Sequence, residues 1–157
     1  MREEYRLVRL IKFDSARRMM SVIVANQNGD LFIFSKGADS AILPLCADKE
    51  SEKYKSTVEH IEKFAEQGMR TLAFAYRALT DVSEAFLDAC SDEQLEAELS
   101  LLGATGVEDM LQEDVQKCIS DFQEAGVRTW IVTGDKNSTA KCIGQTSGVF
   151  GIGRPIL

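Results

Sequence analysis

Runs of hydrophobic, β-forming residues recur along the first third of the chain, and over residues 5–13 they alternate in part with polar residues, as in a half-buried β-strand. The pattern predicts strands over residues 5–13, 20–25 and 31–35, which are rich in Tyr, Leu, Val, Ile and Phe. Residues 26–30, N-Q-N-G-D, predict a tight turn, because Asn and Gly adopt positive φ angles at little cost. Strands joined by short turns predict an antiparallel meander.

After these strands, the spacing of apolar residues is mostly that of helices. Asp39 or Ser40 is a candidate cap for a short helix that ends near residue 45. From residue 51, apolar side chains recur on one face of a long helix, and Gly68 is a suitable C-terminal residue for it. The pattern then predicts a fourth strand over 71–76 and two short acidic helices over 83–89 and 92–99.

The pattern changes near residue 99. A short apolar, glycine-bearing stretch over 101–107 precedes a predicted helix over 112–123, which Gly126 closes. Residues 127–133, V-R-T-W-I-V-T, predict a strand buried on both faces, and a further helix begins near 138. This order of elements, strand, helix, strand, loop and helix, indicates a parallel unit. The expected fold is therefore α+β: an antiparallel sheet with flanking helices, followed by a partial parallel β-α-β-α segment.

The charge is uneven along the chain. The net charge is −7, from 18 basic and 25 acidic residues. Residues 1–47 carry +2, residues 48–126 carry −12 and residues 127–157 carry +3. We interpret the acidic middle as a solvated helix surface, and the overall charge disfavours broad nucleic-acid binding. A mildly basic end can still hold a phosphate.

Other classes of protein are excluded or disfavoured by composition. No apolar run approaches the roughly 20 residues that cross a bilayer, and the first residues lack the apolar core of a signal peptide. The four cysteines are scattered and there is a single His, so zinc-ligand spacing is absent and we expect no metal ligands in this chain. The cysteines are expected to be reduced and mostly buried.

The strongest local motif is the loop Thr133-Gly134-Asp135, at the carboxyl end of the predicted buried strand. Ligands of parallel sheets gather at such ends, glycine permits close approach of the backbone, and a hydroxyl with free N–H groups can bind a phosphate. An ordinary strand-to-helix turn, with Asp135 or Asn137 as the helix cap, explains the same residues.

Three further residues have both a binding and a structural interpretation. Phe13 can stack on a base or lie in the core. Lys36, in Lys36-Gly37-Ala38-Asp39, can reach a phosphate or simply be solvated. Arg70 can bind a phosphate or ribose, or pair with an acidic helix. The phosphate-binding sequence GxxxxGK[ST] is absent, as are GxGxxG and GxSxG, and no Ser-His-Asp set is evident.

Taken in order, five strings carry more information than any one of them: F-D-S-A-R-R-M-M-S-V-I-V (13–24), K-G-A-D-S-A-I (36–42), G-M-R-T-L-A-F-A-Y-R (68–77), L-L-G-A-T-G-V-E-D-M-L-Q (101–112) and V-R-T-W-I-V-T-G-D-K (127–136). The series resembles the cytoplasmic ATP-handling region of P-type ATPases over residues 3–148. K-G-A-D and G-A-T-x-x-E-D-x-L-Q resemble the phospholipid-flipping class, whereas cation pumps more often carry D-P-P-R where this chain has 109–112.

The resemblance implies two domain parts and a set of roles. Residues 1–98 would be part of the nucleotide-binding domain, and residues 99–157 part of the haloacid-dehalogenase-like phosphorylation domain. Phe13 would stack on adenine, Lys36 would line the pocket, Arg70 would hold the phosphate or ribose, and Asp109 would face the nucleotide from the hinge. The loop of Thr133, Gly134 and Asp135 would grip the transferred phosphoryl group, as suits a reaction that depends on positioning and charge stabilisation.

The chain also departs from the pattern. Met110 stands where the flipping class usually has Lys. D-K-T-G-T, which supplies the nucleophilic Asp, and G-D-G-x-N-D, which completes the Mg²⁺ site, are both absent. Covalent catalysis needs that nucleophilic carboxylate, so we expect the chain alone to be inactive as an ATP hydrolase.

The resulting expectation is an ATP-binding fragment of a phospholipid-translocating P-type ATPase. The larger enzyme would hydrolyse ATP with Mg²⁺ at the cytoplasmic face of a membrane, through an aspartyl phosphate, and would use transmembrane helices to move phospholipid, with an accessory subunit as a further partner. Three alternatives remain: a fragment of a cation-transporting P-type ATPase, a free-standing haloacid-dehalogenase-like hydrolase, and a non-enzymatic interaction module that docks through its acidic middle.

Overall fold

The computed structural model describes residues 4–80, 82–108, 110–134 and 137–150. The chain forms two compact units. The first consists of Met1–His60 and Leu72–Thr105, and the second of Ile61–Thr71 and Gly106–Leu157.

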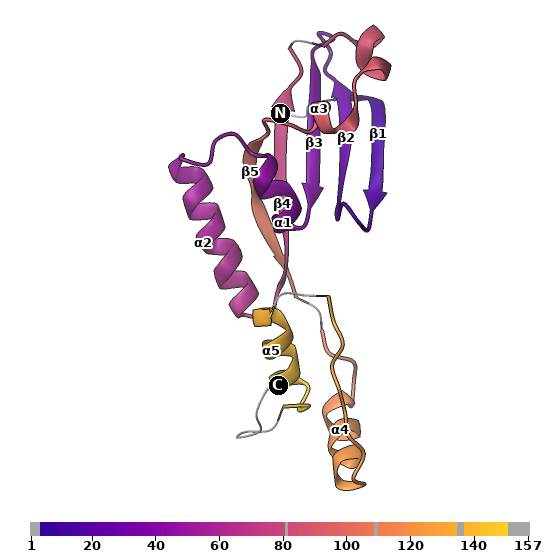
Figure 1. Cartoon of the computed structure of the whole chain (residues 1–157), viewed down its shortest axis with the longest axis vertical. Coiled ribbons are helices and arrows are strands. Elements are labelled where there is room, and N and C mark those ends of the chain that lie inside the picture. The colour runs from indigo at the N-terminus through magenta and orange to yellow at the C-terminus, as the bar shows by residue number, and fades with distance from the viewer. Residues whose placement is uncertain (1–3, 81, 109, 135–136, 151–157) are drawn as a thin grey trace. The chain divides into compact units, whose positions relative to one another are not determined.

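A five-stranded sheet in the order β1-β2-β3-β4-β5 organises the first unit (Figure 1). β1 (Arg6–Asp14), β2 (Met19–Ala25), β3 (Leu31–Gly37) and β4 (Arg70–Ala78) pair antiparallel with their neighbours. The predicted meander is therefore confirmed, and so is the fourth strand. β3 runs two residues further than the pattern predicted, so that Lys36 lies within the strand.

The two faces of the sheet differ in burial. Residues of β2 alternate strictly between buried and half-buried positions, and those of β3 do so as far as Ser35. The buried residues form the inner face, which packs against Ile42 of α1 (Asp39–Ile42), Leu87 of η2 (Glu84–Ala89) and Leu95 of α3 (Asp92–Leu95). Figure 1 shows α1 and α3 lying over this side of the sheet. Burial of these apolar side chains, at roughly 25 cal/mol per Å², is the main stabilising contribution here.

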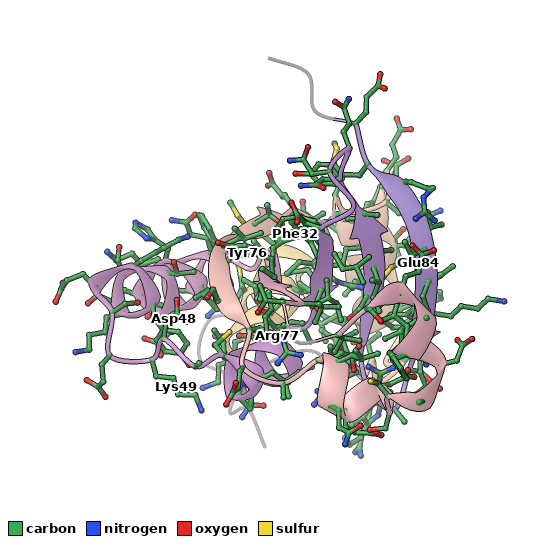
Figure 2. All side chains as sticks on the ribbon, turned by 90° about the horizontal axis from the view of Figure 1, so that it is seen from above. Phe32, Asp48, Lys49, Tyr76, Arg77 and Glu84 are labelled. Carbon is green, nitrogen blue, oxygen red and sulfur yellow. The ribbon has the colours of Figure 1, made fainter. Side chains whose placement is uncertain are left out.

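The outer face carries an aromatic cluster. The rings of Phe32 and Phe34 stack along β3 at 6.5 Å, and Phe34 stacks on Tyr76 of β4 at 6.1 Å. Tyr5 packs edge-on against both phenylalanines at 6.2 Å. Figure 2 shows Phe32 and Tyr76 on one side of the sheet and Arg77 on the other, where its guanidinium donates to the Gln94 carbonyl at 3.2 Å.

The short helices differ in detail from the prediction. Ala38, and not Asp39 or Ser40, is the N-cap of α1, and it provides no side-chain cap. The chain continues into a 3₁₀ turn, η1 (Leu43–Leu45), which contains Pro44. The predicted helix over 83–89 is the 3₁₀ helix η2. α3 ends at Leu95 and not at 99, and Glu98 then takes a positive φ of 55° on the way to the next strand.

The long helix is close to the prediction. α2 covers Glu52–Glu66, and Gly68 follows it with a φ of 80°. A side chain at Gly68 would also meet the Cys142 sulfur at 2.7 Å, which is a second reason for glycine there. In the second unit, α4 (Val115–Glu124) and α5 (Asn137–Thr146) confirm the two later helices, and Gly126 follows α4 with a φ of 78°.

The predicted parallel segment does not form. The apolar stretch over 101–107 is β5 (Ser100–Val107), the last strand of the same sheet as β1 to β4. Residues 127–133 have no regular secondary structure, and Trp130 and Val132 are 76% and 96% exposed. A strand buried on both faces needs paired neighbours and covering helices, and no strand among the described residues pairs with this segment. The prediction of a buried strand is therefore wrong for this chain.

Candidate functional site

The candidate site lies in the first unit, at the end of the sheet where β1 turns into β2. The Asp14 carboxylate accepts hydrogen bonds from the N–H groups of Ala16 and Arg17, at 2.8 and 3.1 Å. The N–H of Arg18 donates to the Asp14 carbonyl at 2.7 Å, and Arg18 itself has a φ of 57°. Asp14 is well suited to this position because Asp side chains readily satisfy the backbone of the next residues in a turn. We call residues 14–18 the site turn.

The site turn packs directly on the end of β3. The N–H of Ala38 donates to the Arg18 carbonyl at 2.9 Å. A methyl group at Gly37 would lie 2.5 Å from that same carbonyl oxygen and 2.5 Å from the Met19 Cβ. The glycine of the K-G-A-D sequence is thus required by the close approach of the turn, and the neighbouring Lys36 is held next to it.

Register brings Phe13 and Lys36 to the same end of the sheet. Met20 pairs with Lys36 on β3, and Lys36 pairs with Phe74 on β4. On β1, the register shifts between Ile11 and Asp14, so that one extra residue of that strand stands opposite Met20. Such a bulge bends the strand and redirects a side chain. Because one strand separates Phe13 from Lys36, their backbones are about 10 Å apart at the usual strand spacing.

Both side chains are accessible. Phe13 is 62% exposed, an unusual position for a large ring, so the core interpretation of Phe13 is wrong. Lys36 is exposed, as are Lys12 and Arg18 at the same end of the sheet. Sequence reasoning did not select Lys12 or Arg18, although their positions beside Phe13 and within a turn were visible. An exposed ring and exposed cations at the same end of a sheet fit a base attached to phosphates.

The other predicted site residues belong to the second unit or are not described. Arg70 is the exposed first residue of β4. Thr133 and Gly134 are exposed and precede α5, but they follow an irregular segment and not a strand, so the loop does not occupy the carboxyl end of a parallel strand in this chain. Asp109 and Asp135 lie outside the described residues. Met110 is 91% exposed.

A buried polar network lies beneath the site turn, and sequence reasoning missed it. Glu96 is only 3% exposed, and its carboxylate pairs with the Arg17 guanidinium. The Ser21 hydroxyl donates to the same carboxylate at 2.6 Å and lies 2.7 Å from the Ser35 hydroxyl, which must then be the donor to Ser21. No local signal separates Glu96 from the other acidic residues around it.

Glu96 is one of three carboxylates that pair with arginines from β1 and the site turn. Arg6 pairs with Glu84 and Arg9 with Asp92, each at 2.6 Å. The hydrogen bond from Arg6 lowers the pKa of Glu84. The acidic segment over 84–96 is therefore partly neutralised by the basic N-terminal strand, which corrects the expectation of a purely solvated surface.

The described residues contain no group of three or more His, Cys, Asp or Glu side chains that could hold a metal ion. All four cysteines are free. Cys46 is buried, and this desolvation raises the pKa of its thiol to about 11, whereas Cys118 is exposed, so the expected burial is right for Cys46 and wrong for Cys118. Neither is close in sequence to the site turn.

Comparison with known families shows the family of the chain. The profile of the family "P-type ATPase, cytoplasmic domain N" matches residues 1–114, which includes the whole site turn and the K-G-A-D sequence. The chain belongs to the P-type ATPases. In this family member, the matched region covers all five strands of the sheet.

Individual relatives of this P-type ATPase chain carry lipid-transport names. It is 37% identical to "Phospholipid-transporting ATPase 10" of Arabidopsis thaliana, over 93% of this chain and 14% of that protein. It is 40% identical to "Phospholipid-transporting ATPase IH" of Mus musculus, over 88% of this chain and 13% of that protein. A third, "Phospholipid-transporting ATPase 11C" of Mus musculus, is 40% identical over 88% of this chain and 14% of that protein.

The chain thus spans about one seventh of the length of these relatives. Among the described residues, no helix is both long enough and apolar enough to cross a membrane.

Proposed function

We propose that this chain binds ATP beside the site turn, at Phe13 and Lys36, and is the nucleotide-recognising part of a phospholipid-transporting P-type ATPase. The observation that carries the proposal is the position of exposed Phe13 and exposed Lys36 at the same end of the sheet, in a region that matches the family's cytoplasmic domain N. The lipid-transport names of the relatives support the choice of class.

Each residue has a physical role in this proposal. The Phe13 ring provides a flat apolar surface for adenine, and stacking of a base on an aromatic ring contributes about 1–3 kcal/mol. Lys36 supplies a point charge for the phosphates or the ring edge. The short, hydrogen-bonded site turn holds Phe13 in place before ATP arrives, which lowers the entropic cost of binding.

The remaining residues complete the proposal. Arg70 would hold the phosphate or ribose, Asp109 would face the nucleotide, and Thr133, Gly134 and Asp135 would grip the transferred phosphoryl group. Their motifs support these roles. The proposed division into a nucleotide-binding part at 1–98 and a phosphorylation-domain part at 99–157 needs one adjustment, because β5 (Ser100–Val107) belongs to the sheet of the first part.

The larger protein would hydrolyse Mg²⁺-bound ATP at the cytoplasmic face of a membrane and move phospholipid between leaflets, with an accessory subunit as a further partner. This chain contributes no described metal cluster and no D-K-T-G-T nucleophile, so no hydrolytic step is assigned to it. We expect it to bind ATP without turnover.

Calorimetric titration of the 157-residue chain with ATP tests the proposal. Phe13→Ala should weaken binding about tenfold, in line with the loss of one stacked base. Lys36→Ala should weaken binding several-fold, and more at low salt than at high salt, because the lost contact is electrostatic. Phosphate release should not exceed that of a blank.

Matched controls are available in the same unit. Phe86 of η2 is 67% exposed, a fraction similar to the 62% of Phe13. Phe86→Ala therefore removes a comparably accessible ring away from the site turn. Lys53→Ala does the same for an exposed lysine on α2. Both should bind ATP as the unmodified chain does. Equal losses in the controls and the site variants, or no binding at all, would contradict the proposal.

A further inference from the structure

We propose that the ion pair between Arg17 and the buried Glu96 positions the nucleotide site: it holds the site turn on the end of β3 and thereby sets the place of the Phe13 ring. This inference rests on the proposed ATP binding. It assigns a role in that binding to Arg17 and Glu96, which would not contact the nucleotide themselves.

The two side chains of the ion pair differ in burial. Glu96 follows α3 directly and its side chain is 5% exposed, whereas the side chain of Arg17, in the site turn, is 34% exposed. The carboxylate is thus a fixed, buried anchor, and the guanidinium reaches to it from the turn. Burying a carboxylate is costly unless it is paired and hydrogen-bonded, and Arg17 and Ser21 together supply these contacts to Glu96.

Hydrogen bonds connect Glu96 to β2 and, through β2, to β3. Ser21 of β2 donates to Glu96, and Ser35 of β3 donates to Ser21. Ser21 is adjacent to Met20 and Ser35 is adjacent to Lys36, so the inner-face network lies directly behind the outer-face positions of the candidate site. One carboxylate therefore joins the site turn, β2 and β3.

The ion pair also restricts the backbone conformation of the site turn. Arg18 has a positive φ of 57°, an uncommon conformation for a residue with a side chain. The turn keeps it because contacts on both sides hold it: the Ala38 N–H bonds the Arg18 carbonyl, and Glu96 bonds the preceding residue. Phe13 immediately precedes Asp14, the first residue of this turn, so any shift of the turn moves the ring.

The test uses Glu96→Gln in the 157-residue chain. The amide keeps the size of the side chain and leaves no buried charge, and Arg17 can turn towards solvent. The matched control is Asp92→Asn, which removes the ion pair between Arg9 of β1 and the same acidic segment, away from the site turn.

Two measurements are needed. Hydrogen exchange of the Ala38 amide reports whether the turn stays on β3: it should accelerate in Glu96→Gln and not in Asp92→Asn. Calorimetry with ATP and with adenosine should show both ligands weakened roughly threefold to tenfold by Glu96→Gln, since the effect acts through the base. In a Phe13→Ala background, Glu96→Gln should add less than about a twofold change.

The outcomes separate the two proposals. Unchanged Ala38 exchange, a loss that adds fully to that of Phe13→Ala, or an equal loss in Asp92→Asn would each overturn the positioning role. If the unmodified chain binds no ATP, the proposed function fails, and Ala38 exchange still decides whether the pair holds the turn. If Glu96→Gln does not fold, the double variant Arg17→Gln/Glu96→Gln removes both charges and should behave as described for Glu96→Gln.

Discussion

Gly37 links the sheet to the candidate site at the scale of one residue. Its φ is not in the left-handed region, so the need for glycine is not conformational; the reason is space. The Arg18 carbonyl and the Met19 Cβ occupy the volume that any side chain would take. The same backbone contact is what brings the site turn next to Lys36.

Gly37→Ala should therefore destabilise the chain by about 1–3 kcal/mol, the usual cost of forcing a methyl group into a packed position. It should also weaken ATP binding, because the turn must move away from β3. Urea unfolding followed by circular dichroism measures the first effect. Lys36→Ala, at the adjacent exposed position, is the control and should stay within about 0.5 kcal/mol of the unmodified chain. Equal stability of the Gly37→Ala variant would contradict the close contact.

At the scale of elements, the short acidic helix α3 matters more than its four residues suggest. It begins with a complete capping box: the Ser91 hydroxyl accepts from the Gln94 N–H at 3.3 Å, and the Gln94 side chain accepts from the Ser91 N–H at 3.1 Å. α3 contributes Leu95 to the core, and Glu96 follows it directly. A secure helix start therefore helps to place the buried carboxylate.

Ser91→Ala should reduce the free energy of unfolding by about 1 kcal/mol, the typical value for a lost N-cap. Ser83→Ala is a close control, because Ser83 is the N-cap of η2 but makes no side-chain cap hydrogen bond. Chemical denaturation of both variants gives the comparison. A similar loss in both would mean that the capping box contributes nothing.

At the scale of the whole molecule, the strands of the sheet are paired, whereas the apolar residues 127–133 are paired with no described strand. The strands of the sheet find their partners within the chain, whereas residues 127–133 have an apolar sequence and no strand beside them among the described residues. Val127, Trp130 and Val132 are all more than half exposed. Their hydrophobicity is thus not used for packing here.

The single tryptophan of the chain reports on this segment directly. Trp130 is 76% exposed, so its fluorescence should peak at the long wavelength of an indole in water. Quenching by acrylamide should be nearly as efficient as for free tryptophan. A short-wavelength, protected emission would show instead that residues 127–133 are packed in this chain.

Much of the fold was predictable because it depends on short-range patterns. Runs of β-forming residues located β1 to β4, helical spacing located α2 and α4, and Gly68 and Gly126 marked helix ends. The interpretation of 101–107 as the start of a parallel unit was wrong because an apolar run does not reveal its partner: β5 pairs beside β4, far from it in sequence.

The candidate site was predictable only in part. Phe13 and Lys36 were selected by their motifs, but their common position depends on the register of β1, β2 and β3. Glu96 resembled its acidic neighbours in sequence. Its burial, and its bonds to Arg17 and Ser21, arise between residues 75 and 79 positions apart.

The sequence by itself determined β1 to β4, the longer helices and the P-type ATPase family, because these follow from local conformational preferences and from ordered motifs. Tertiary structure alone decided which strand completes the sheet, which carboxylate is buried and why Gly37 has no side chain. Those outcomes depend on contacts between distant segments, and one residue's neighbours in space cannot be derived from its neighbours along the chain.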